Sequence, residues 1–126
     1  MALKDNIIEF LGILEGYHQT CKMLHWSTTN KSEHVLVDEI DKDVLEFEDR
    51  IAEVAMGKLK TRFGIGSLKA MLPNAENLDD MIKEYESDVL KLKKDIGDKP
   101  EYSGFQNILD DMLESIDKYY YLKTLK

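Results

Sequence analysis

The sequence contains one cysteine, two prolines and one tryptophan in 126 residues. The single cysteine, Cys21, cannot form an internal disulfide, and the N-terminal stretch MALKDNIIEF lacks the basic and apolar regions of a secretory signal. No apolar run approaches the roughly 20 residues that a membrane-spanning helix needs. These absences predict a chain that folds without disulfides, with a reducing cytoplasm as its compartment.

Basic residues are also scarce, since 17 Lys and Arg stand against 25 Asp and Glu, and the net charge is −8. Nucleic-acid binding draws its affinity from Lys and Arg that neutralise phosphates, and neither terminus carries a Lys-rich tail, so DNA binding is not expected. An acidic surface favours cations instead. At this length the chain is expected to form one domain, residues 1–126.

Apolar residues recur with helical spacing in four stretches of the chain. No strand pattern, internal repeat or low-complexity segment competes with them. The sequence therefore predicts an all-α fold, an antiparallel four-helix bundle with mostly short connections. The expected helices cover about residues 4–28, 31–60, 78–96 and 100–122.

Several helix ends have recognisable signals. Asn30 and Glu33 can form a capping box at the start of the second helix, and Asn77 can cap the third. Gly97 is a typical helix stop. Residues 62–77 contain two glycines and a proline and predict a connection with at most one short helical turn.

Four potential metal ligands occupy the outer face of the second expected helix, roughly 150° from its apolar stripe. Leu45, Ala52 and Met56 share that face, so it combines apolar and polar side chains, as expected of a surface that contacts another subunit. An ordinary solvated acidic face is the alternative interpretation. The four side chains are His34, Asp38, Asp49 and Glu53.

The spacing of these ligands indicates a site shared by two copies. His34 and Glu53 are roughly 28 Å apart along one helix, so one chain cannot use both for one ion. If the helix packs antiparallel against its own copy about a two-fold axis, His34 faces the partner's Glu53, and Asp38 faces the partner's Asp49. Each of two identical sites then holds an imidazole and carboxylates, a set that suits iron or manganese.

The tripeptide LHW ends the first expected helix, and the short connection places His25 beside the same site. Together with His34-x3-Asp38-x10-Asp49-x3-Glu53, this pattern resembles the Dps-like mini-ferritins of the ferritin-like superfamily, as a short, divergent member. The resemblance implies a ferritin-like bundle and a ferroxidase centre between two subunits. The metal ligands that it implies are His25, His34 and Asp38 from one chain and Asp49 and Glu53 from the other.

The same resemblance implies a function in iron storage and oxidative stress. Hydrogen peroxide or oxygen would oxidise Fe2+, and ferric mineral would be stored in a hollow homododecamer, which protects against peroxide. Trp26 would lie beside the metal and serve as an electron donor, although packing at the helix end is its simpler interpretation. A metal-free helical oligomer with a structural or interaction role is the alternative function, and a DNA-compacting protein is a third.

Other polar residues have simpler explanations. Glu15-x2-His18 matches one half of the signature of di-iron bundles, which need two such motifs, and no second copy is present. His18 is therefore expected to be a partly buried helix residue, and Cys21 a small core residue. Most other acidic residues of the second helix, Asp41 and Glu48 among them, are expected to be solvated.

Overall fold

The computed structural model describes residues 2–125, which contain four α-helices and no β-strand. The prediction of an all-α fold with four helices is thereby confirmed. The fourth helix differs from expectation at its start, because Pro100–Tyr102 forms a tighter 3-10 turn, η1, before the α-helix begins. The helices are α1 (Leu3–Ser27), α2 (Lys31–Leu59), α3 (Leu78–Ile96) and α4 (Ser103–Leu122).

Side-chain caps and a glycine determine where the helices begin and end. The Asn30 side chain accepts the Glu33 amide at 3.1 Å, and the Asn77 side chain caps α3 in the same way. The capping box forms only in part, because the Glu33 carboxylate accepts the Thr28 hydroxyl at 3.1 Å. Gly97 ends α3 with a φ of 81°, a conformation that suits glycine.

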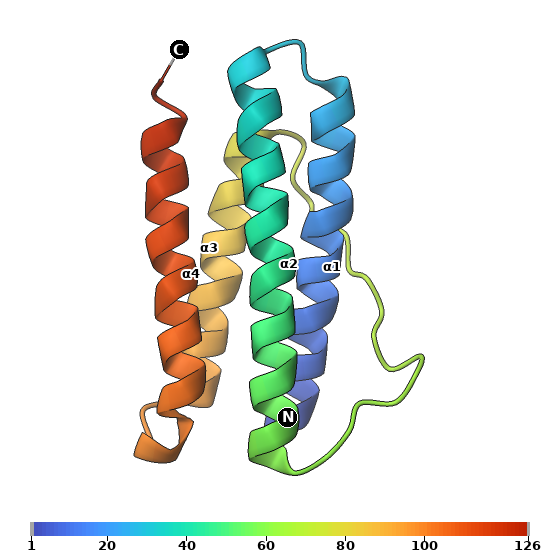
Figure 1. The fold of residues 1–126 in the computed structure, drawn as a ribbon, viewed down its shortest axis with the longest axis vertical. Helices are drawn as coiled ribbons and strands as arrows, with labels where there is room; N and C mark the ends of the chain where they lie inside the picture. The colour runs from blue at the N-terminus through green and yellow to red at the C-terminus, as the bar shows by residue number, and fades with distance from the viewer. Residues whose placement is uncertain (1, 126) are drawn as a thin grey trace.

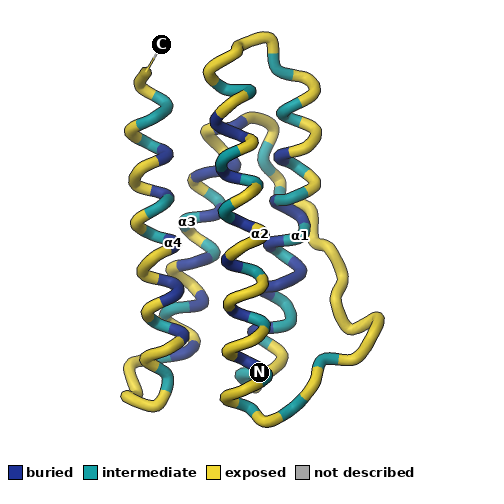
Figure 2. Tube along the Cα trace, viewed as in Figure 1, coloured by how far each residue is buried: buried dark blue, intermediate teal, exposed yellow. Residues whose placement is uncertain are grey.

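The apolar stripes of the four helices meet in one buried core (Figure 2). Tyr17, Tyr85 and Tyr119 are among its largest fully buried side chains, and Cys21 is buried as expected. Val54 was expected to point inward but is 37% exposed. A straight helix drifts away from a strict seven-residue repeat, so Ala55 takes the inward position instead.

A long connection, residues 60–77, joins the two halves of the bundle and contains no helical turn. It returns along the outside of α1 to the opposite end of the bundle, so α2 and α3 run in the same direction (Figure 1). Both α1 and α4 pack against α2 and α3. Neighbouring helices run in opposite directions: Glu39 of α2 pairs with Lys118 of α4, whereas Arg50, further along α2, pairs with the earlier Asp111.

Two glycines of α1 allow the connection to lie directly on the helix backbone. A Cβ atom at Gly12 would be 2.2 Å from the Lys69 carbonyl oxygen, and one at Gly16 would be 1.8 Å from the Met71 carbonyl oxygen. The Met71 amide also donates to the Gly12 carbonyl at 2.9 Å. No side chain fits between the two backbones, so these positions require glycine.

Candidate metal centre

The connection between α1 and α2 is three residues long and brings two histidines together. His25 lies in the last turn of α1, and His34 lies at the end of the first turn of α2. Their rings are stacked, with centroids 3.7 Å apart and an interplanar angle of 23°. His25 is therefore beside His34, where the short connection was expected to place it.

Backbone carbonyls determine which ring nitrogens of these histidines are free. His34 Nδ1 lies 2.8 Å from the His25 carbonyl oxygen, and His25 Nδ1 lies 3.3 Å from the His34 carbonyl oxygen. A carbonyl oxygen only accepts, so each Nδ1 must carry the proton. With the proton on Nδ1, the Nε2 lone pair of each ring is available to a metal ion, as in metal sites where a carbonyl oxygen at the other ring nitrogen fixes the tautomer.

Asp38 completes this group of side chains one turn further along α2. Its Oδ1 lies 3.0 Å from His25 Nδ1, and its side chain is 66% exposed. The carboxylate therefore helps to orient the His25 ring while it remains accessible to a ligand. Two imidazoles and one carboxylate, His25, His34 and Asp38, thus lie together at one end of the α1–α2 pair.

Asp49 and Glu53 are exposed and lie further along α2. Asp49 is about 17 Å from Asp38 along the helix axis, and Glu53 is about 22 Å from it. Within residues 2–125, no group of three or more His, Cys, Asp or Glu side chains is arranged to hold a metal ion. His25, His34 and Asp38 of one chain are therefore not arranged as a complete metal site, and Asp49 and Glu53 lie too far along α2 to join them.

Apolar side chains are exposed near these ligands. On α2, Leu45 is 37% exposed, and Ala52 and Met56 are partly buried, so the outer face of α2 is mixed. Trp26 is 69% exposed, and the ammonium of Lys22 lies 5.9 Å from its ring centroid. The expectation that Trp26 packs at the end of α1 is wrong for the single chain, because the ring points outward from the last turn.

Further polar contacts lie deeper in the bundle, between α2 and its neighbours α1 and α4. His18 is partly buried as expected, and its Nδ1 lies 2.6 Å from Asp41 Oδ1. Asp43 accepts a hydrogen bond from the Tyr119 hydroxyl, and burial and this carboxylate raise the pKa of Tyr119. The expectation that Asp41 is solvated is wrong, because its carboxylate is only 21% exposed and pairs with His18.

Glu48 is a further acidic residue that the sequence interpretation treated as solvated. It lies against Glu15 of α1, and one of its carboxylate oxygens is buried without a hydrogen-bond partner. Burial, and then the hydrogen bond with Glu15 and repulsion from Glu15, raise the pKa of Glu48 to about 8. Its position could have indicated this burial, because Glu48 lies two turns beyond Asp41, on the side of α2 that faces α1.

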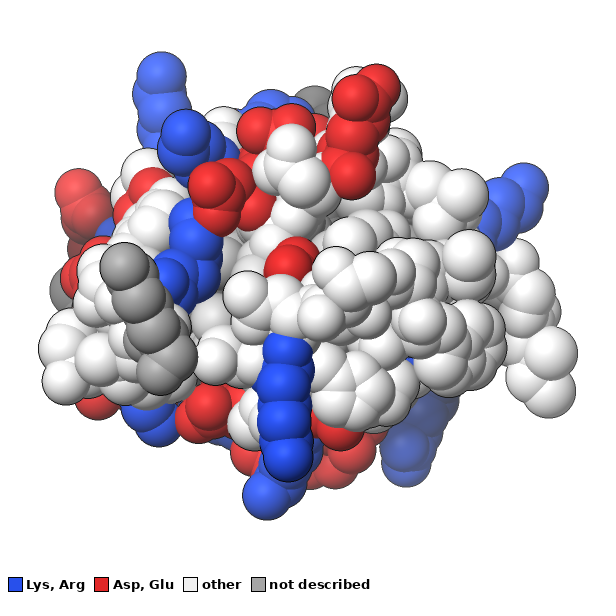
Figure 3. All heavy atoms as spheres, turned by 90° about the horizontal axis from the view of Figure 1, so that it is seen from above, with Lys and Arg blue, Asp and Glu red and all other residues white. Residues whose placement is uncertain are grey.

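Figure 3 views the molecule from the end that carries the α1–α2 connection. Acidic and basic side chains are mixed over much of this face, and a broad area on its right is uncharged.

Comparisons of the chain with protein-family models, curated proteins and solved structures give no match. Among the described helices, none combines the length and apolar character needed to cross a membrane. The geometry of the α1–α2 pair is thus the basis for assigning a function.

Proposed function

We propose that this protein is a Dps-like mini-ferritin that oxidises Fe2+ at a centre shared by two copies of the chain. The observation that carries the proposal is the grouping of His25, His34 and Asp38 with both Nε2 atoms available. Exposed Asp49 and Glu53, on the same helix, would complete the centre from the partner. Iron storage and protection from peroxide would follow from this activity.

The arrangement of the helices supports a ferritin-like bundle. Ferritin-like folds differ from simple up-down bundles by one long crossover connection. Here residues 60–77 run along the bundle, and α2 and α3 point in the same direction (Figure 1). A short connection between α2 and α3 would have made them point in opposite directions.

In the proposed centre, imidazole nitrogens and carboxylates bind Fe2+ as substrate and leave positions open for the oxidant. Two Fe2+ ions each lose one electron, and one hydrogen peroxide takes up both electrons and two protons to become two water molecules. The negative charge of Asp38, Asp49 and Glu53 stabilises the Fe3+ product. Trp26, next to His25 in the sequence, is the proposed electron donor when only one iron is bound.

The second candidate function is a metal-free helical oligomer with a structural role. One observation favours it: His25 and Asp38 already satisfy each other at 3.0 Å within the chain. In that case the mixed outer face of α2 would bind another copy without metal. Iron content and Fe2+ oxidation separate the two candidates.

The decisive experiment replaces Asp49→Asn and Glu53→Gln together. We expect Fe2+ oxidation, followed by ferric absorbance, to slow by more than about tenfold, with loss of bound iron, because the variant lacks two charged ligands. The helical circular dichroism should be unchanged, since both side chains are exposed.

The matched control is Asp80→Asn with Glu84→Gln, which makes the same charge change at the same four-residue spacing on α3. The control should keep the wild-type rate. Wild-type oxidation by the Asp49→Asn, Glu53→Gln variant, or equal loss in the control, would contradict the assignment of the centre.

A further inference from the structure

The end of α2 and most of the connection that follows it form a basic segment in an acidic chain. Residues 54–75 include four basic side chains and no acidic one. With a net charge of −8 for the whole chain and +4 for this segment, the other residues carry −12. Within residues 2–125, none of the four forms an ion pair. They are Lys58, Lys60, Arg62 and Lys69.

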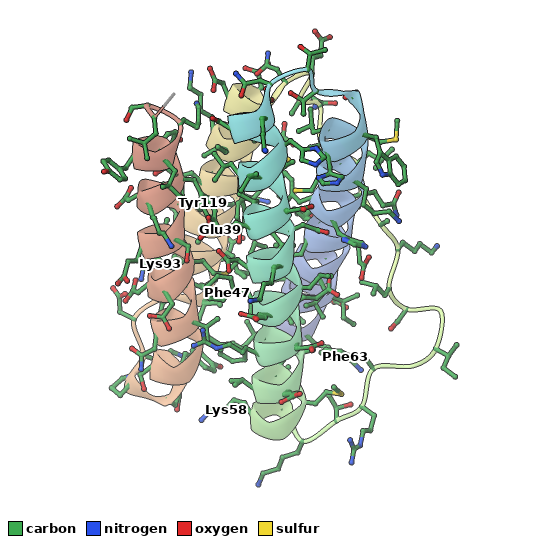
Figure 4. The ribbon with its side chains drawn as sticks, turned by 45° about the horizontal axis from the view of Figure 1, so that its top comes forward. Glu39, Phe47, Lys58, Phe63, Lys93 and Tyr119 are labelled. Carbon is green, nitrogen blue, oxygen red and sulfur yellow. The ribbon has the colours of Figure 1, made fainter. Side chains whose placement is uncertain are left out.

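The same segment exposes apolar side chains although it is held against the bundle. All residues from 64 to 72 are exposed, and Leu72 is 68% exposed. Phe63 packs partly against the core, and Figure 4 shows Lys58 near the end of α2. An anchored segment with exposed apolar and unpaired basic groups is typical of an interaction surface.

Charge of the opposite sign gathers on α4. Residues 100–117 contain five acidic side chains and no basic one. Asp110 and Asp111 pair with Lys93 and Arg50, yet their side chains remain 59% and 54% exposed. Four of the acidic residues, Asp110, Asp111, Glu114 and Asp117, recur at helical spacing and form the acidic face of α4.

These two surfaces cannot meet within one molecule. Figure 1 shows the connection on the α1 side of the bundle and α4 on the opposite side. Complementary surfaces on opposite sides of a subunit favour a head-to-tail contact between copies. Such a contact gives a ring when the rotation between copies closes and an open filament when it does not.

We propose that the basic segment, residues 58–72, of one copy docks on the acidic face of α4 of another copy. This contact uses neither the outer face of α2 nor any proposed iron ligand, so it does not depend on the ferroxidase activity. Combined with a two-fold contact through α2, it gives each copy two different interfaces. Two kinds of interface allow a closed assembly larger than a dimer.

The test is a charge exchange followed by native mass spectrometry and light scattering. We expect the wild-type protein to assemble beyond a dimer, and Lys60→Glu with Arg62→Glu to shift it to a dimer or monomer. The reverse variant, Glu114→Lys with Asp117→Lys, should also lose the large species. Mixing the two variants should restore it, because each then supplies the charge that the other needs.

The matched control is Lys83→Glu with Lys94→Glu, which changes the net charge equally on exposed positions of α3 and should assemble like the wild type. Raising the salt from about 0.05 M to about 0.5 M should weaken the wild-type assembly. A wild-type protein that stays a dimer or monomer, or variants that fail to complement each other while keeping their helical circular dichroism, would overturn the proposal. Binding of a DNA duplex through Lys60 and Arg62, without any larger protein assembly, would also overturn it and assign the connection to polyanions.

Discussion

Glu48 and Glu15 form a contact between α1 and α2 in which full ionisation is unfavourable. Glu48 is partly buried, and one of its oxygens has no hydrogen-bond partner. Because its pKa is raised to about 8 in the folded chain, it carries a proton at neutral pH that the unfolded chain would release. Folding is therefore linked to proton uptake at this residue.

The linkage predicts that the free energy of unfolding falls as the pH rises from about 5 towards 8. The folded state binds more protons than the unfolded state across this range, so each increase in pH favours unfolding. Glu48→Gln removes this dependence and should stabilise the protein at pH 8 by about 1–2 kcal/mol, a value reduced for solvent screening. Urea unfolding at several pH values measures both effects.

Glu46→Gln is the control, because Glu46 lies on the same helix two residues away but is exposed. Its unfolding free energy should follow the wild-type pH profile. If the free energy of unfolding changed with pH equally in the wild type and in the Glu48→Gln variant, Glu48 would release its proton as an ordinary glutamate does.

At the residue scale, the sequence predicts which polar groups are present but not which acidic side chains are buried. His25 and His34 could be placed together because the turn between their helices is short. The burial of Glu48 depends on how closely α1 approaches α2, which no local pattern specifies. Trp26 shows the opposite case. A large aromatic residue is usually packed, but Trp26 is 69% exposed.

The position of the connection between α2 and α3 depends on two glycines of α1. Its carbonyl oxygens lie on α1 at Gly12 and Gly16, where even a methyl group overlaps them. The spacing of four residues places both glycines on one side of α1. That side is the path of the connection along the bundle.

Gly16→Ala should therefore detach part of the connection, although alanine is the better helix former by about 1 kcal/mol. The new methyl group would lie 1.8 Å from the Met71 carbonyl oxygen, so the backbone of residues 69–72 must move. We expect destabilisation by about 1–3 kcal/mol, the usual cost of overpacking, together with faster proteolysis within residues 60–77. Thermal unfolding and mapping of the cleavage sites measure these changes.

Gly57→Ala provides the control, because a Cβ atom there has no neighbour within 4 Å. That variant should be neutral or stabilised by up to about 1 kcal/mol, through helix propensity alone. If Gly16→Ala behaved in the same way, the close approach between α1 and the connection would be absent in solution.

At the element scale, local chemistry predicts most of the fold. The caps at Asn30 and Asn77 and the stop at Gly97 specify where helices begin and end, and apolar spacing specifies which sides are buried. The path of the connection was not predicted, because a polar, Gly-containing segment specifies a break but not its direction. The stretch GILEG, residues 12–16, could have indicated this path, since two glycines four residues apart allow another backbone to approach the helix.

At the scale of the whole molecule, the folded chain has two separated half-sets of ligands. His25, His34 and Asp38 are brought together within the chain, so the fold of one copy specifies them. Asp49 and Glu53 lie on the same helix but far from this group, and only a partner could bring them to it. Sequence spacing could suggest such a partner, but a single chain contains none of the contacts that would establish it.

A shared centre predicts that two inactive variants restore each other. One variant carries His34→Ala and Asp38→Ala, and the other carries Asp49→Ala and Glu53→Ala. Each homodimer would have two defective centres, whereas a mixed dimer would combine the intact half-sets of the two chains in one centre and leave the other with His25 alone. After subunit exchange, a random mixture contains about half mixed dimers with one working centre each, so about a quarter of the wild-type Fe2+ oxidation should return. Native mass spectrometry of chains with different tags verifies the exchange, and a mixture of each variant with its own tagged copy should stay inactive. Inactivity after verified exchange would mean that the ligands of one centre do not come from two chains.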